Sequence, residues 1–209
     1  MLSRPVSRKW HWANPLVQNF QLSKRITMNP ADPLKIIMPT KSDAISHYRA
    51  RPMREVSLIL NDIRSAENVG SIFRTADAAG AVKIYLCGYT PAPLDRFGRE
   101  NAKLAKAALS AEKTVPWEQA GDVTALIRSL KTRGICVVAI EQDPRSVAYD
   151  AFTEDGSIAF ILGNEVSGIP EEVLDIADAI LEIPMRGKKE SLNVAVATGI
   201  VLYSLTQSG

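Results

Sequence analysis

The stretch from Ile158 to Tyr203 contains two short apolar runs that each lead into a glycine-containing loop, and it constrains the fold more than any other part of the chain. Ile158–Leu162 leads into Gly163–Pro170, and Ala179–Ile183 leads into a second loop that reaches an apolar helix pattern at Ser191–Asn193. Short continuous runs of this kind are typical of strands buried on both faces of a parallel sheet. Because α/β proteins bind ligands at the ends of such strands, the stretch predicts a small-molecule pocket made from these loops.

The same alternation of apolar runs and helix patterns extends back to Glu55 and indicates an α/β fold class. A strand at Val56–Leu60 is followed by a helix with Asn68 as its N-cap, which ends at Gly80, and by a strand at Val82–Cys87. Further strands are predicted at Lys113–Pro116, Ile135–Ile140, Ser157–Leu162 and Ala179–Ile183, and further helices at Asn101–Leu109, Glu118–Arg133, Pro170–Ile176 and Ser191–Leu205. This order predicts a mainly parallel sheet flanked by helices.

Composition is that of a globular protein and disfavours several other classes. The 209 residues are 46% hydrophobic and 23% charged, which suits one domain with an appendage or two small domains. Two cysteines far apart in the sequence, Cys87 and Cys136, make neither a disulfide framework nor a zinc knuckle. We expect both to be small buried apolar residues in a reducing compartment, taken here as the cytoplasm. The longest apolar run, Val194–Leu205, is shorter than the ~20 residues of a membrane helix, and no hydrophobic signal segment opens the chain.

Positive charge is concentrated in residues 1–54, which we treat as a basic N-terminal arm joined to a domain at residues 55–209. The arm contains ten Lys or Arg residues and two acidic residues, whereas the domain contains 15 basic and 21 acidic residues. Prolines interrupt every candidate element of the arm, and aromatic residues such as Trp10, Trp12 and Phe20 lie among its charges. This mixture favours contact with nucleic acid. A solvated tail, an arm packed on the domain and an organelle transit peptide are the alternatives.

Several familiar chemistries lack their residues. The sequence has no G-x-G-x-x-G after the first strand, no phosphate-binding G-x-x-x-x-G-K-[ST], no H-E-x-x-H and no Cys/His cluster for a metal. Both histidines, His11 and His47, lie in the arm, which excludes a histidine-based triad within the domain. The loops offer Arg, Asn, Ser, Glu and backbone amides instead. That set suits substrate positioning and charge stabilisation.

Three motifs occur in order, at Asn68–Ala76, at Phe160–Glu165 with Gly168, and at Ile183–Val194. Each is a weak signal alone, but together, across residues 55–205, they resemble the SpoU/TrmH family of the SPOUT superfamily of RNA methyltransferases. The resemblance implies a homodimer that transfers a methyl group from S-adenosylmethionine to a ribose 2′-hydroxyl of tRNA or rRNA. The missing metal motifs and the short apolar runs independently predict no metal and no membrane. The resemblance also implies the SPOUT fold, whose sheet carries a C-terminal trefoil knot.

The resemblance assigns site residues by their positions in the motifs. Those that it places at the reacting centre are Arg74, Asn68, Glu165, Ser191 and Asn193. Those that it places against the cofactor, mainly through backbone groups, are Gly163, Ile183 and Leu192, with Met185 and Ala139 as neighbours. Five of them have a structural alternative: helix N-caps for Asn68 and Ser191, a solvated helix residue for Arg74, a turn for Gly163, and an acceptor of loop amides for Glu165.

Arg74 matches the family's catalytic arginine, for which two roles are open. One role is that of the base that deprotonates the ribose hydroxyl. A neutral guanidinium is costly near pH 7, because the pKa of arginine lies above about 12. We therefore favour the other role, in which Arg74 holds a substrate phosphate bidentately and stabilises the developing alkoxide.

Two departures from the family and two rival functions bear on the substrate. Val166 stands where the family often has glycine, and the folded N-terminal RNA-binding domain of many relatives is matched here by the basic arm alone. Deletion of residues 1–50 is therefore expected to weaken RNA binding and to leave cofactor binding intact. The rivals are a non-catalytic RNA-binding protein that retains the knotted fold, and methylation of a base or of a non-RNA substrate.

Overall fold

The computed structural model describes residues 55–206, so the basic arm and the nucleic-acid contacts predicted for it lie outside the described residues. The strands are β1 (Val56–Asn61), β2 (Lys83–Cys87), β3 (Trp117–Ala120), β4 (Cys136–Ile140), β5 (Val147–Ala148), β6 (Ile158–Leu162) and β7 (Ala179–Glu182). The helices are α2 (Ala66–Ala79), α3 (Ala102–Ala108), α4 (Ala111–Thr114), α5 (Val123–Thr132), the 3₁₀ helix η2 (Tyr149–Ala151), α6 (Glu171–Leu174) and α7 (Val194–Thr206).

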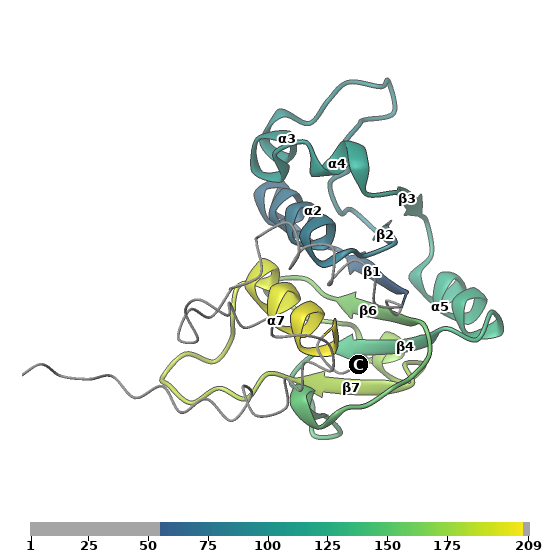
Figure 1. The fold of residues 1–209 in the computed structure, drawn as a ribbon, viewed down its shortest axis with the longest axis vertical. Helices are drawn as coiled ribbons and strands as arrows, with labels where there is room; N and C mark the ends of the chain where they lie inside the picture. The colour runs from purple at the N-terminus through teal and green to yellow at the C-terminus, as the bar shows by residue number, and fades with distance from the viewer. Residues whose placement is uncertain (1–54, 207–209) are drawn as a thin grey trace, which may run out of the picture. The chain divides into compact units, whose positions relative to one another are not determined.

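The strands form one sheet in the order β3-β2-β1-β6-β4-β7-β5, and every pairing is parallel (Figure 1). β1 and β6 lie at its centre, and both are buried along their whole length. This burial explains their mostly apolar sequences, interrupted in β1 by the buried Ser57 and Asn61, since a strand covered on both faces has no solvent side to mark with polar residues. The expected mainly parallel α/β sheet is confirmed.

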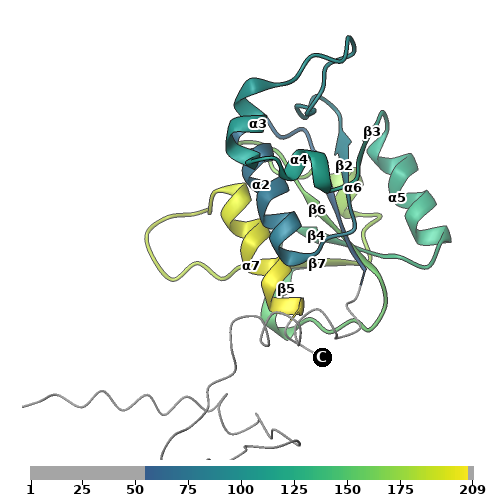
Figure 2. The same ribbon diagram turned by 45° about the horizontal axis from the view of Figure 1, so that its top comes forward.

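Helices cover the two faces of the sheet, and the alternation along each strand assigns side chains to one face or the other. Leu58 and Leu60 of β1 belong to a core shared with α2, α3 and α7, whereas Ile59 belongs to a second core shared with α5 and α6. On the first face α2 lies between α3 and α7 (Figures 1 and 2). Gly70 permits the close approach of α2 to α3, because a Cβ there would lie 2.3 Å from the Leu104 carbonyl oxygen.

The carboxyl ends of all seven strands lie at one edge of the sheet, because every pairing is parallel. The segments that leave this edge are 62–65 after β1, 88–101 after β2, 141–146 after β4, 163–170 after β6 and 183–193 after β7. The three motifs therefore begin at, or lead into, the same edge. This is the edge at which open α/β sheets bind their ligands.

Most predicted elements are confirmed, but two boundaries are wrong. α2 begins at Ala66 and not after Asn68, because the Ser65 hydroxyl accepts a hydrogen bond from the Asn68 amide (3.1 Å) and so forms the cap. α7 begins at Val194 and not at Ser191. There the side-chain oxygen of Asn193 accepts from the Ala195 amide (2.9 Å), which makes Asn193 the capping residue.

The region from 111 to 133 differs more from expectation. The strand predicted at Lys113–Pro116 is replaced by α4, and the edge strand β3 lies just beyond it, where it pairs with β2. The helix predicted from Glu118 begins only at Val123. Trp117–Ala120 forms β3 instead, and Asp122 caps α5 by accepting hydrogen bonds from the Thr124 and Ala125 amides. Tertiary pairing of β3 with β2 here overrides a helical pattern.

Cys87 and Cys136 are free thiols, the first buried and the second half-buried. Burial raises the pKa of Cys87 to about 12 and that of Cys136 to about 11, so neither is an activated nucleophile near neutral pH. Within residues 55–206 no helix is long and apolar enough to cross a membrane. The same residues contain no group of three or more His, Cys, Asp or Glu side chains able to hold a metal ion.

Candidate active site

Three predicted site residues, one from each motif, are joined by hydrogen bonds. The side-chain amide of Asn68 donates to Glu165 Oε1 (2.8 Å), and the side-chain amide of Asn193 donates to Asn68 Oδ1 (3.0 Å). Glu165 also accepts from the backbone amides of Arg64 (2.9 Å) and Ser65 (3.2 Å), at the start of α2. The structure thus brings the three motifs together in one polar cluster, defined as Asn68, Glu165 and Asn193.

Glu165 is held ionised by this arrangement. Partial burial is the largest single influence on its pKa and would raise it, but the hydrogen bonds from Arg64, Asn68 and Ser65 together outweigh burial and lower the pKa from 4.5. At neutral pH the cluster therefore presents a carboxylate that accepts, with Asn68 and Asn193 oriented by it in turn. An ionised Glu165 whose oxygens accept three N–H groups is suited to orient neighbours.

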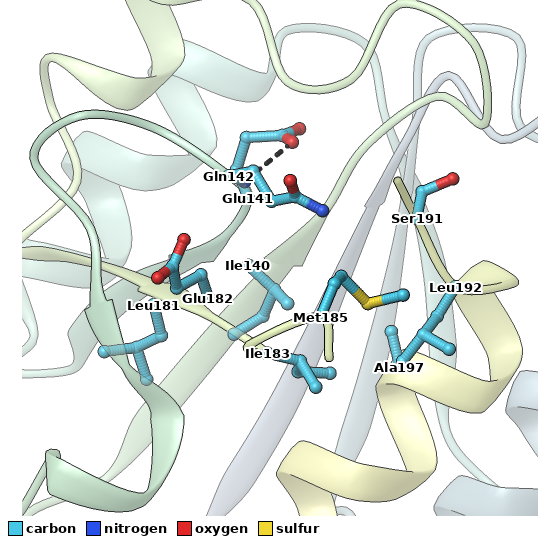
Figure 3. Close-up of a pocket in the computed structure, with 10 residues that line it drawn as sticks. All are labelled: Ile140, Glu141, Gln142, Leu181, Glu182, Ile183, Met185, Ser191, Leu192 and Ala197. Atoms are coloured by element: carbon cyan, nitrogen blue, oxygen red, sulfur yellow. Dashed lines mark hydrogen bonds between the residues drawn. The ribbon is translucent and has the colours of Figure 1, made fainter. Parts of the chain in front are cut away.

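A cavity open to solvent lies beside this cluster, at the ends of β4 and β7 (Figure 3). Including its open mouth it measures about 430 Å³. Its walls are apolar side chains interspersed with three acidic or amide side chains and one hydroxyl; the lining residues are Ile140, Glu141, Gln142, Leu181, Glu182, Ile183, Met185, Ser191, Leu192 and Ala197. The apolar walls suit a small molecule with apolar parts, and the two carboxylates favour a ligand with positive charge.

The segment from Ile183 to Asn193 links the cavity to the polar cluster. Ile183, Met185 and Leu192 line the cavity, as expected of cofactor contacts, and the next residue, Asn193, donates to Asn68. Ser191 also lines the cavity, so its side chain stands with the cofactor candidates and not with the polar cluster. One short loop therefore contributes to both parts of the site.

The remaining predicted residues do not line this cavity. Gly163 packs against its own loop, where an added Cβ would lie 2.6 Å from the Gly168 carbonyl carbon and from Ile169 Cγ1. Ala139 is fully buried in β4, next to the cavity residue Ile140. Arg74 is exposed on α2, six residues and about 9 Å of helix beyond Asn68. Among residues 55–206 it forms no ion pair or side-chain hydrogen bond.

Glu141 and Gln142 are cavity residues that the motifs do not identify. Glu141 accepts from the Ile169 amide (2.9 Å), which ties the end of β4 to the loop after β6. Gln142 donates from its side chain to the Glu190 carbonyl, which ties the same point to the loop after β7. Gly168 is required beside Glu141, because it has a φ of 69° and an added Cβ would lie 2.5 Å from a Glu141 carboxylate oxygen.

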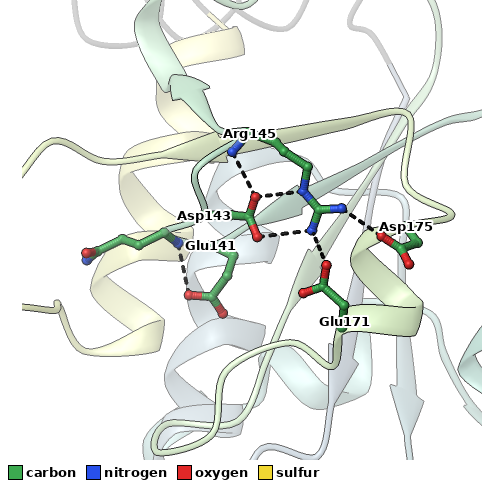
Figure 4. A network of polar contacts seen from close by, with 6 residues as sticks. Glu141, Asp143, Arg145, Glu171 and Asp175 are labelled. Carbon is green, nitrogen blue, oxygen red and sulfur yellow. Dashed lines mark hydrogen bonds and ion pairs between the residues drawn. The ribbon is translucent and has the colours of Figure 1, made fainter.

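An ion-pair network holds the loop after β4 on α6 (Figure 4). The Arg145 guanidinium donates to Asp143 (2.7 Å), Glu171 (2.8 Å) and Asp175 (2.6 Å). Its hydrogen bonds to Asp143 lower the pKa of that carboxyl. Because Asp143 follows the cavity residue Gln142 directly, the network fixes the backbone next to this part of the cavity wall. The spacing of these residues in the sequence gave no indication of the contact.

Asn164 fixes the shape of the loop that carries Glu165. Its side-chain oxygen accepts from the Val166 (2.8 Å) and Ser167 (2.9 Å) amides, and its backbone pairs with Gly168 in an antiparallel bridge. Its side-chain amide donates to the Asp62 carbonyl (2.9 Å) and the Tyr89 hydroxyl (2.6 Å). Asn164 thus joins the loops after β6, β1 and β2, and it holds Glu165 against α2.

Comparison with known proteins assigns the domain to a family. The model of the SpoU rRNA Methylase family matches residues 55–203. The chain is 34% identical over 146 residues to the 23S rRNA (guanosine-2′-O-)-methyltransferase RlmB of Ralstonia nicotianae, and 34% identical over 145 residues to that of Neisseria meningitidis. These alignments cover 70% and 69% of the chain. The chain spans little more than half the length of these relatives, 56% and 55% respectively.

Solved structures agree with this assignment. An AdoMet-bound rRNA methyltransferase from Sinorhizobium meliloti has a TM-score of 0.66 and 33% identity, over 75% of this chain and 58% of the other. A TrmH/SpoU tRNA modifying enzyme from A. aeolicus has a TM-score of 0.65 and 25% identity, over 79% of this chain and 82% of the other. With its three motif segments gathered at one edge of a parallel sheet, the chain belongs to the SpoU rRNA methylase family.

Proposed function

We propose that the protein transfers a methyl group from S-adenosylmethionine to a ribose 2′-hydroxyl of RNA, in tRNA or rRNA. The observation that carries the proposal is the dual role of the segment from Ile183 to Asn193. Its apolar residues line the cavity, and its last residue, Asn193, belongs to the polar cluster through its hydrogen bond to Asn68. The names of the relatives, which describe rRNA (guanosine-2′-O-)-methyltransferases, and the AdoMet-bound neighbour support the same chemistry.

The cavity residues fit the proposed cofactor in chemical character. Ile140, Ile183 and Leu192 offer apolar surface for an adenine ring and a thioether chain, while Glu141 and Glu182 favour positive charge. S-adenosylmethionine supplies an electrophilic methyl group on a cationic sulfur. The protein's part is then to orient the acceptor hydroxyl, since alignment of two bound reactants alone can supply much of the rate.

Each proposed residue at the reacting centre has a distinct task. Glu165 orients Asn68, and Asn68 accepts from Asn193, so these three residues hold the substrate side of the site in one arrangement. Arg74 holds a substrate phosphate and stabilises the alkoxide that develops as the ribose hydroxyl loses its proton. Its exposure on α2, with no competing ion pair among residues 55–206, leaves the guanidinium available for a phosphate.

The wider expectations about the protein are also part of the proposal. The parallel order β6-β4-β7, together with the segment between β7 and α7, is compatible with the trefoil knot of the SPOUT fold. Val196 on α7 is 52% exposed, which favours a second copy of the chain as the partner of this helix in a homodimer. The acceptor RNA remains a prediction from the family, and a cytoplasmic location remains a prediction from the two cysteines.

Calorimetric titration with S-adenosylmethionine tests the proposal against the rival function, a non-catalytic RNA-binding protein. The wild-type chain should bind the cofactor. Leu192→Arg should weaken binding at least tenfold, because it places bulk and positive charge in the cavity. Leu109→Arg, at another exposed leucine outside the cavity, should bind like the wild type. A wild-type chain that does not bind the cofactor would favour the rival.

A further inference from the structure

A compact loop projects from the carboxyl edge of the sheet between β2 and α3 (Figures 1 and 2). We call its tip, Leu94–Glu100, the Phe97 loop. Leu94 and Glu100 form an antiparallel bridge at its base. The Asp95 carboxylate accepts from the amides of Phe97 (2.8 Å) and Arg99 (2.9 Å) and from the Arg99 guanidinium (2.7 Å). These bonds give the tip a defined shape.

The loop presents an aromatic ring to solvent beside two guanidinium groups. The side chain of Phe97 is 66% exposed, and the guanidinium carbons of Arg96 and Arg99 lie 4.8 and 5.1 Å from its ring centre. A single exposed apolar residue is ordinary on a protein surface. A ring that is held at a loop tip by backbone hydrogen bonds, with two arginines at cation–π distance, is a more specific arrangement.

The Phe97 loop lies on the same side of the domain as the polar cluster. It follows β2, whose carboxyl end lies at the edge that carries the motifs, and Tyr89 before it accepts from Asn164. At its other end α3 brings Lys103 to within 4.0 Å of Glu67, the neighbour of Asn68. A polymer bound at the cluster would therefore pass along this loop.

Charge distinguishes the Phe97 loop together with the adjoining part of α3 from the rest of the domain, although residues 94–100 alone contain two basic and two acidic side chains. Residues 94–106 contain four basic side chains and two acidic ones, whereas residues 55–209 as a whole contain 15 basic and 21 acidic ones. The basic residues are Arg96, Arg99, Lys103 and Lys106. A local excess of positive charge on an acidic domain is complementary to a polyanion.

We propose that the Phe97 loop binds an unpaired nucleotide of the substrate RNA, with a base stacked on Phe97 and the adjacent phosphates on Arg96 and Lys103. The inference rests on the proposed function and names a surface that this function uses. Exposed rings that stack on bases, beside cations that meet phosphates, are typical of single-stranded RNA recognition. A contact between two copies is disfavoured, because a two-fold axis through the loop would set its arginines against those of the partner.

The test measures binding of two fluorescent RNA probes to the full 209-residue chain, a hairpin with an unpaired loop and a fully paired duplex of the same stem. Phe97→Ala should weaken hairpin binding roughly tenfold, the usual scale for loss of one stacked base, and should leave duplex binding nearly unchanged. Phe97→Tyr, which keeps the ring, should restore hairpin binding. Arg96→Ala should reduce the salt dependence of binding by about one phosphate contact.

Matched controls remove similar groups elsewhere. Leu109→Ala removes an exposed apolar side chain at the end of α3. Arg133→Ala removes a cation from the end of α5, which leads into the amino end of β4 and so lies away from the carboxyl ends of the strands. Both should bind the hairpin like the wild type. All variants should bind S-adenosylmethionine with unchanged affinity, because the loop contributes no residue to the cavity.

Three outcomes would overturn the inference. Wild-type hairpin affinity in Phe97→Ala would remove the stacking role, while the proposed function would stand if that variant and the wild type still methylate RNA. Equal losses of affinity of Phe97→Ala for the hairpin and for the duplex would show a general effect on RNA binding and not the loss of a stacked base. Loss of binding together with a changed sedimentation coefficient would assign Phe97 to a contact between copies. A wild-type chain that binds neither RNA nor cofactor would instead refute the proposed function itself.

Discussion

At the scale of the residue, Glu165 connects more parts of the polar cluster than any other side chain in it. Its two carboxylate oxygens accept from Arg64, Ser65 and Asn68, residues that lie about a hundred positions earlier in the sequence. The structural alternative for Glu165, an acceptor for amides of its own loop, holds in part, because the backbone amide of Glu165 itself also lowers the pKa of this carboxyl. The carboxylate binds amides of the first motif region, so a structural role and an orienting role coincide in one side chain.

Glu165→Gln should destabilise the fold, because a donating amide group would face N–H groups that need an acceptor. We expect a loss of about 1 kcal/mol in the free energy of unfolding at pH 7, a modest value because the side chain is mostly exposed. Chemical denaturation checks this value. Glu172→Gln, an exposed carboxylate in the first turn of α6, is the control and should change stability less.

The effect of Glu165→Gln on the free energy of unfolding should depend on pH. The folded-state pKa of Glu165 is lowered from 4.5, so its ionised form stabilises the fold at pH values above 4.5. That contribution is lost as the pH falls through the folded-state pKa. The stability difference between wild type and Glu165→Gln should therefore be constant near neutrality and shrink below pH 4.5. A difference that persists unchanged in acid would contradict the assignment.

Arg74→Lys separates the two roles of Arg74 only in part, so it is combined with a pH–rate profile. Lysine keeps the charge but loses the bidentate geometry, so kcat should fall by about tenfold or more while cofactor affinity stays unchanged. If Arg74 holds a phosphate, the pH–rate profiles of the wild type and of Arg74→Lys should have the same shape above neutrality. An alkaline limb in the wild-type profile that moves to lower pH in Arg74→Lys would support the arginine base instead, because lysine is the more easily deprotonated of the two.

At the scale of the element, the loop after β6 depends on a close approach between backbones. Gly163→Ala would place a Cβ 2.6 Å from the Gly168 carbonyl carbon, and a backbone atom cannot move aside cheaply. We expect a loss of about 1–3 kcal/mol in unfolding free energy. Gly187→Ala is the control, because no atom lies within 4 Å of its added Cβ. Equal stability of the two variants would show that the loop adjusts freely.

Helix α7 carries the prediction of a homodimer. Val196 on this helix is 52% exposed and is not among the buried core residues of the domain. Val196→Asp should dissociate a dimer into folded monomers, because it buries a charge in an apolar contact. Sedimentation velocity reports the change, and circular dichroism shows that the monomer stays folded. A wild-type chain that sediments as a monomer would contradict the prediction.

The elements that could be predicted are those whose sequence records their burial. β4 and β6 are continuous apolar runs and β1 is nearly so, and their positions follow from that pattern alone. β3 has no such pattern, since its residues Trp117–Ala120 are partly exposed and are held by backbone pairing to β2. The family resemblance likewise predicted Ile183, Met185 and Leu192 as cofactor contacts, and all three line the cavity. Glu141 and Arg145 act through tertiary contacts that no local spacing records.

At the scale of the whole molecule, the parallel sheet gathers its loops at one edge, where they share the work of the site. The cavity lies at the ends of β4 and β7, the polar cluster joins the loops after β1, β6 and β7, and the Phe97 loop follows β2. The proposed cofactor site, the proposed reacting centre and the proposed RNA contact thus fall on neighbouring loops. The arrangement is best explained by a function in which two ligands, the proposed cofactor and the RNA, meet at this edge of the domain.

The identity of the methylated product tests that account most directly. The wild-type chain would be incubated with labelled S-adenosylmethionine and with total RNA from cells that lack this protein, and the RNA would be digested to nucleosides. We predict that the label appears in a 2′-O-methylated nucleoside, and that Asn193→Ala lowers its yield while cofactor affinity is retained. Label in a base-methylated nucleoside, or no transfer by a wild-type chain that binds the cofactor, would contradict the account.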